Sequence, residues 1–79
     1  MARAALFIEG EQIAERGLRV PKRVEKIEAW SRACLKTFER ELGKQPIMLV
    51  KHTIDADTIR LGYVNGIGIL VRRHASPLG

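Results

Sequence analysis

The chain has 79 residues, of which 46% are hydrophobic and 5% aromatic. This length suits a single small domain, so we treat residues 1–79 as one unit and expect residues 74–79 to form a flexible tail. The chain is too short for a deep enclosed cleft, and its apolar runs are too short to span a bilayer or to act as a secretory signal. We therefore expect a cytoplasmic protein that is not an enzyme and does not contact membranes.

The charge of the chain favours anionic partners. Lys and Arg number 14 and Asp and Glu number 9, which gives a formal charge of +5. Residues 16–26 carry five basic residues and one glutamate, and residues 44–79 carry five basic residues and two aspartates. This excess is compatible with nucleic acid or with an acidic protein surface, and it does not choose between them.

The N-terminal segment "AALFIEG" predicts a short strand at about residues 4–9 that ends at Gly10. If this strand pairs at an edge, it becomes the fourth strand of the sheet described below. A helical start that runs into "EQIAERG" is the alternative for this part of the chain.

The main helix is predicted over about residues 21–42. Pro21 suits the first helical position, and Gly43 suits a C-terminal cap. Cys34 is the only cysteine and falls on the apolar side, where we interpret it as a buried residue. Apolar residues recur at steps of three and four and form one stripe, namely Val24, Ile27, Cys34, Leu35, Phe38 and Leu42.

Three antiparallel strands in meander order are predicted after the helix, at about residues 47–54, 58–63 and 67–73. These runs are rich in β-branched and apolar residues, and turn sequences separate them. A long helix packed on one face of such a sheet makes an α+β fold, a two-layer sandwich.

The turn between the last two strands decides which side chains face the helix. A two-residue Asn65-Gly66 turn would place an arginine on each face of the hairpin. A three-residue loop that starts at Val64, built as a type I turn with Gly66 left-handed, instead leaves one face wholly apolar. Burying an unpaired arginine costs several kcal/mol, so we predict the three-residue loop.

This register gives the sheet a distinctive outer face. Gly62 and Gly68 lie opposite each other there, flanked by Arg60, Arg72 and an exposed Leu70. A bare glycine pair would let a flat or extended partner approach the backbone closely. The alternative is that the glycines accommodate the twist of the sheet or the N-terminal segment of the chain.

The predicted start of the helix is both uncapped and positively charged. With Pro21 as the first helical residue, Val20 is the N-cap and offers no side-chain acceptor. Cations are unfavourable at this end of a helix, so an external anion is expected to complete the site, although Glu25 and solvent are the simpler alternative. The cations of the helix start are Arg19, Lys22, Arg23 and Lys26, and Lys36 and Arg40 continue the basic surface along the helix.

No catalytic residue, metal site or cofactor is predicted. His52, Asp55 and Asp57 lie close in sequence, but aspartates in a turn normally bond their own backbone. A zinc site would need further nitrogen or sulfur donors.

We therefore predict a small basic nucleic-acid-binding accessory protein that uses non-specific phosphate contacts. Chains this small and basic are common among ribosome-associated proteins and among the plasmid and phage proteins of mobile elements. An aromatic stacking platform is not expected, because the aromatic residues Phe7, Trp30, Phe38 and Tyr63 are assigned to the core or its border. The alternative is a protein-interaction module or inhibitor, homodimeric or docked on an acidic partner. It would use the sheet face or a free strand edge, with Leu70 and either Leu49 or Ile47 exposed.

Overall fold

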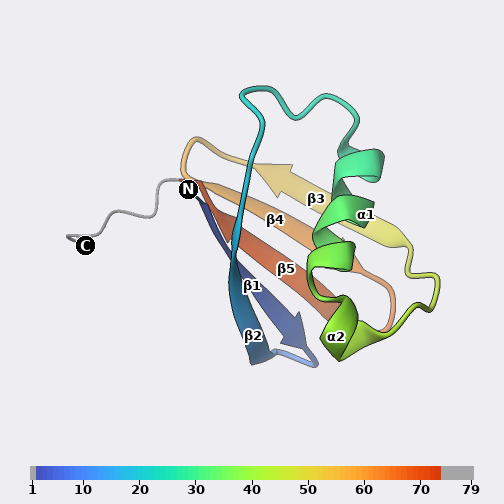
Figure 1. Cartoon of the computed structure of the whole chain (residues 1–79). Coiled ribbons are helices and arrows are strands. Elements are labelled where there is room, and N and C mark those ends of the chain that lie inside the picture. Colours follow the sequence, from blue (N-terminus) through green and yellow to red (C-terminus); the bar gives the residue numbers. More distant parts are fainter. Residues whose placement is uncertain (1, 74–79) are drawn as a thin grey trace.

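The computed structural model describes residues 2–73 and has two layers (Figure 1). The strands β1 (Ala2–Ile8) and β2 (Glu11–Leu18) come first, followed by the helices α1 (Ile27–Thr37) and α2 (Glu39–Leu42). The strands β3 (Leu49–Ile54), β4 (Thr58–Tyr63) and β5 (Ile67–Arg72) complete the chain. All neighbouring strands are antiparallel, in the order β2-β1-β5-β4-β3. The α+β class is as expected, and the predicted tail at 74–79 lies outside the described residues.

The sheet is wider than the predicted three or four strands. β1 pairs with β5, as expected for a strand added to the meander, and β2 then adds a fifth strand at the sheet edge. The sequence of β2, "EQIAERGL", lacks a clear alternation because its positions facing the helices are Ala14, Arg16 and Leu18. Without that alternation, the sequence carries little signal for a strand.

The helical segment is shorter than predicted. α1 begins at Ile27, with Lys26 as the preceding cap residue, so the expectation of a helix from Pro21 with Val20 as N-cap is wrong. Val20 and Val24 are partly buried against the core although neither is helical. A connection that packs apolar side chains on the core can therefore continue the stripe of the helix that follows it.

The predicted helix is also interrupted before its end. Phe38 has φ −109° and ψ 27° and separates α1 from α2. Gly43 ends α2 as predicted, with φ 75° and its N–H donating to the Glu39 carbonyl at 2.8 Å. Glycine adopts this left-handed conformation without a Cβ clash.

The predicted register of the last hairpin is confirmed, because Gly62 lies opposite Gly68 in the ladder between β4 and β5. The predicted turn type is wrong, since Asn65 (φ 62°) and Gly66 (φ 69°) are both left-handed. The backbone N–H of Val64 donates to the Met48 carbonyl at 3.0 Å. Val64, the third residue of the loop, is therefore hydrogen-bonded to the residue that precedes β3. Asn65 and Gly66 keep the left-handed conformation that an Asn-Gly pair favours.

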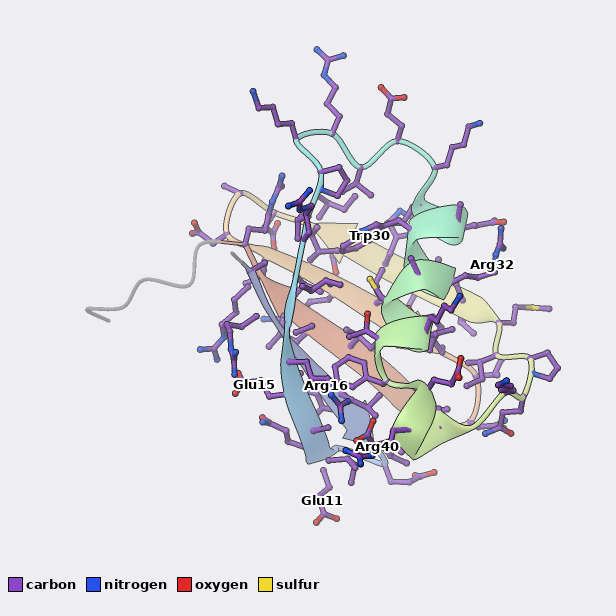
Figure 2. The ribbon with its side chains drawn as sticks, viewed as in Figure 1. Glu11, Glu15, Arg16, Trp30, Arg32 and Arg40 are labelled. Carbon is purple, nitrogen blue, oxygen red and sulfur yellow. The ribbon has the colours of Figure 1, made fainter. Side chains whose placement is uncertain are left out.

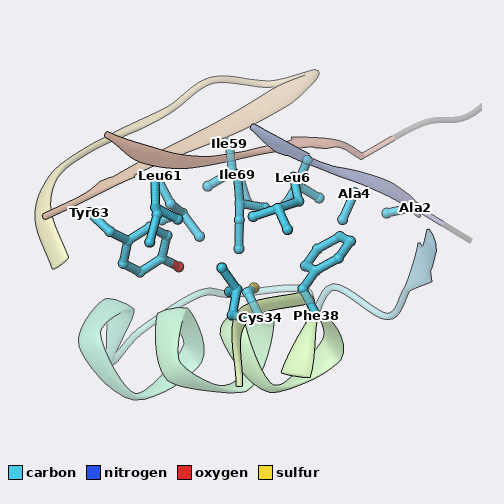
Figure 3. Packing of buried hydrophobic residues seen from close by; sticks show 12 residues of the cluster. Ala2, Ala4, Leu6, Cys34, Phe38, Ile59, Leu61, Tyr63 and Ile69 are labelled. Atoms are coloured by element: carbon cyan, nitrogen blue, oxygen red, sulfur yellow. The ribbon is translucent and has the colours of Figure 1, made fainter. Parts of the chain in front are cut away.

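The core lies between the helices and one face of the sheet (Figure 3). Tyr63 is buried there, and its hydroxyl donates to the Ser31 carbonyl in α1 at 2.9 Å. Figure 3 shows the core side chains pointing from the sheet toward Cys34 and Phe38. The sheet contributes mainly Leu6, Ile59, Leu61, Ile69 and Val71.

An ion pair joins the edge strand β2 to the short helix α2. The Arg16 guanidinium donates to both carboxylate oxygens of Glu41, at 2.7 and 2.6 Å. The central guanidinium carbon of Arg16 lies 5.3 Å from the centre of the Phe38 ring.

Within residues 2–73, no helix is both long enough and apolar enough to cross a membrane.

Candidate nucleic-acid interface

One face of the sheet carries both helices (Figure 3), and within residues 2–73 no helix lies on the opposite face. We call this opposite side the outer face. Cross-strand partners point to the same side of a sheet, so the ladders assign its residues directly. The residues of the outer face include Arg3, Phe7, Glu15, Lys51, Arg60, Gly62, Gly68, Leu70 and Arg72.

The outer face is strongly cationic. Its paired strand positions carry four exposed cations, and Glu15 is the one carboxylate among them. Glu15 lies 3.4 Å from the Arg3 guanidinium, and both side chains are about half exposed, at 45% and 47%. This pairing reduces the repulsion that Glu15 would exert on an approaching anion. The four cations are Arg3, Lys51, Arg60 and Arg72.

The glycine pair is only half bare, in contrast to the expectation. A Cβ on Gly62 would lie 3.0 Å from Cγ of Lys51, whose aliphatic chain runs across this glycine. A Cβ on Gly68 would meet only the Leu61 carbonyl oxygen, at an ordinary 3.5 Å. The open backbone on this face is therefore the part around Gly68.

Phe7 lies on the outer face, so its assignment to the core is wrong. It pairs with Gly68 on one side and with Gln12 on the other. The face of Phe7 follows from the alternation along β1, in which Ala4 and Leu6 are fully buried on the helix side. Ala5 and Phe7 are as apolar as Ala4 and Leu6, so the sequence itself does not show which pair faces outward. The half-buried Phe7 helps to line a hollow of about 290 Å³ with Arg3, Ala5, Gln12, Glu15, Leu70 and Arg72.

The structure does not bring all the predicted cations together. Arg60 and Arg72 share the outer face, whereas Lys36 and Arg40 lie on the helices, on the other side of the sheet. Figure 2 shows Arg40 on the short helix α2, in the helical layer. The remaining predicted cations are exposed in the connection between β2 and α1, and they are Arg19, Lys22, Arg23 and Lys26.

Arg19 differs from the other three cations of that connection. Together with Arg73 it lines a hollow of about 370 Å³ where β1 begins and β5 ends. Arg3 and Arg72 are paired at the same end of the sheet. Arg19 therefore extends the positive charge of the outer face around that end.

A second surface is the free edge of β3, which within the described chain pairs only with β4. Met48 is 71% exposed and Val50 is 64% exposed on this edge. Leu49 and Ile47, the residues expected there, are instead half-buried. They line a groove of about 690 Å³ between α1 and the segment that leads into β3.

Two features of the described residues bear on possible chemistry. Cys34 is fully buried, and desolvation raises the pKa of its thiol to about 12, so the nucleophilic thiolate is strongly disfavoured. Residues 2–73 contain no cluster of three His, Cys, Asp or Glu side chains that would hold a metal ion.

Comparison with protein-family models, with curated proteins and with solved structures finds no match to this chain.

Proposed function

We propose that this protein is a small nucleic-acid-binding accessory protein that holds a phosphate backbone on the outer face of its sheet. The observation that carries this proposal is the open sheet face with four exposed cations and one carboxylate, which is itself paired with Arg3. Lys and Arg side chains that neutralise phosphates release condensed counterions, which supplies affinity without reading sequence.

The cations predicted at the helix start have a smaller part in this proposal than the sequence suggested. These cations lie in a connection, and α1 begins after Lys26 without a side-chain cap. They raise the positive potential of the whole chain, which speeds the approach of a polyanion. Direct contact with the same stretch of nucleic acid falls to the outer face and to Arg19 at its end.

The test is a salt titration of binding to a labelled random oligonucleotide, followed by fluorescence anisotropy. If the four cations each neutralise one phosphate, affinity falls on the order of a hundredfold between about 50 and 200 mM salt. The double variant Arg60→Glu with Arg72→Glu should weaken binding strongly and reduce the salt dependence by roughly half.

The matched control is Lys36→Glu with Arg40→Glu, which makes the same change in net charge in the helical layer. The affinity of this control and its dependence on salt should stay close to those of the parent protein. Equal losses in both double variants would mean that net charge alone governs binding, and the assignment to the outer face would then fail. Absence of binding by the parent at low salt would overturn the proposed function itself.

The second candidate is a protein-interaction module that uses the β3 edge, and the exposed side chains of Met48 and Val50 favour it. An unpaired strand edge with apolar neighbours is a ready template for another strand. Sedimentation equilibrium tests this reading. If the β3 edges of two copies pair, the protein should form a dimer whose stability does not depend on salt and which Val50→Lys disrupts. A monomer at all concentrations would exclude this self-pairing.

A further inference from the structure

We infer that the outer face binds single-stranded nucleic acid, and that the hollow around Phe7 receives one unpaired base that carries an exocyclic amino group. This inference rests on the proposed function and adds the class of nucleic acid and the group that is recognised. It is carried by a juxtaposition in the structure: an aromatic ring, an open glycine and a carboxylate lie together within a cationic surface.

The floor of the hollow suits a flat ring. Phe7 lies beside Gly68, which has no side chain to stand next to the phenyl ring, and Ala5 and Leu70 form an adjacent pair. A volume of about 290 Å³ lies near the lower end of the range for ligand pockets. The hollow therefore fits one planar group, and bases stack on aromatic side chains irrespective of their identity.

The position of the hollow favours a single strand over a duplex. Phe7 is half-buried in the middle of a sheet, with β2 on one side and β5 on the other. To reach such a ring a paired base must first be unpaired and unstacked, which costs free energy, whereas an unpaired base can be splayed out onto it. Arg3 and Arg72 line the same hollow and stand where the phosphates beside that base would lie.

Glu15 supplies the chemical preference. A carboxylate on a phosphate-binding face opposes the anion, yet Glu15 lines the hollow and is held 3.4 Å from Arg3. An ionised carboxylate only accepts hydrogen bonds. It can accept from the N4 amino group of cytosine, whereas uracil presents an oxygen at that position and is repelled. Glu15 therefore favours cytosine over uracil, which differ at this one substituent.

The first experiment compares single strands with a duplex. The probes are oligo(dC), oligo(dU) and a random duplex, each about ten nucleotides long, measured by anisotropy at neutral pH and fixed salt. The parent should bind oligo(dC) more tightly than the duplex. Phe7→Leu keeps an apolar side chain but loses the aromatic face, so it should weaken single-strand binding by about tenfold and leave duplex binding unchanged.

Phe7→Trp is the conservative counterpart and should retain single-strand affinity. Circular dichroism confirms that both variants are folded. If Phe7→Leu binds oligo(dC) as well as the parent, or if the parent binds the duplex equally well, the stacking site is wrong. Steep salt dependence would then still support the proposed function. Failure of the parent to bind any of the three probes would overturn both the stacking site and the proposed function.

The second experiment tests Glu15 through a ratio of affinities. The parent should prefer oligo(dC) to oligo(dU), and Glu15→Gln, whose amide both donates and accepts, should bring this ratio close to one. Glu28→Gln makes the same charge change on the exposed surface of α1 and should leave the ratio unaltered. An unchanged ratio in Glu15→Gln would overturn the role of this carboxylate.

Discussion

Tyr63 illustrates how one side chain links the two layers. Tyr63 is 5% exposed, and its hydroxyl donates to the Ser31 carbonyl across the core at 2.9 Å. Burial raises the pKa of the Tyr63 phenol above its usual value, so the hydroxyl stays protonated and keeps its role as donor. The only tyrosine in the chain is therefore a structural contact and is not available for stacking.

Tyr63→Phe should lower the free energy of unfolding by about 1 kcal/mol, because the hydrogen bond is lost while the ring is retained. Urea denaturation followed by circular dichroism measures this value. Tyr63→Leu is the comparison, since it also removes ring volume and should cost more. A Tyr63→Phe protein as stable as the parent would mean that this hydrogen bond makes no net contribution.

At the scale of elements, the first hairpin carries a local strain. Glu9 and Gly10 form the two-residue turn between β1 and β2, and both have positive φ, at 53° and 80°. The Glu9 N–H donates to the Gly66 carbonyl at 2.9 Å, which ties this turn to the turn between β4 and β5. Glutamate is unfavourable in the left-handed region, whereas asparagine is well tolerated there.

Glu9→Asn should therefore stabilise the protein by about 0.5–1 kcal/mol without altering the backbone hydrogen bond. Thermal unfolding of the variant and of the parent measures this difference in stability. The control is Glu11→Asn, which makes the same substitution at the first residue of β2 and should not stabilise, because asparagine is disfavoured in strands. A loss of stability in Glu9→Asn would show that the glutamate side chain itself has a structural role.

The contact between β2 and α2 predicts a dependence on pH. The hydrogen bonds from Arg16 hold the pKa of the Glu41 carboxyl below its ordinary value of 4.5. The unfolded chain therefore binds this proton more readily than the folded chain does. The stabilisation is fully present above the ordinary pKa and is lost as the pH falls through the lower folded pKa.

Glu41→Gln should reduce the Tm at neutral pH and flatten the decline of Tm under acid conditions. Melting curves recorded from neutral pH to below the ordinary glutamate pKa test both effects. Glu39→Gln, on an exposed side chain of the same helix, is the matched control and should follow the parent curve. Parallel curves for Glu41→Gln and the parent would exclude a stabilising ion pair.

At the scale of the whole molecule, the sheet separates structure from surface. One face builds the core with the helices, and the outer face carries the cations, so changes on the outer face should alter binding with little effect on stability. The two properties can therefore be measured independently, even in a chain of 79 residues.

Gly68→Ala is the sharpest test of this separation. Its Cβ has room at 3.5 Å from the nearest atom, so the Tm should remain near that of the parent, while the new methyl group beside Phe7 should weaken oligonucleotide binding. Gly62→Ala is the comparison, because its methyl group meets the flexible Lys51 side chain, away from the hollow. If Gly68→Ala unfolds the protein, Gly68 is structural and its neighbourhood is not a binding surface.

The sequence by itself determined the features that local chemistry and burial decide. The strand at 58–63 and the pairing of Gly62 with Gly68 followed from keeping arginine out of the apolar face. Gly43 marked the end of the helical segment because no other residue suits that conformation as well. Arg60 and Arg72 were correctly placed on the outer face for the same reason of burial.

Only the tertiary structure decided the rest. β2 is a strand because β1 offers it an edge, and its own sequence has too weak an alternation to predict that pairing. Val24 matches the helical stripe but, like Val20, it reaches the core from a connection, because burial stabilises an apolar side chain whatever its backbone conformation. Phe7 came to the outer face because β1 lies against β5 with Leu6 opposite Ile69 on the core side, a long-range pairing that no local pattern specifies.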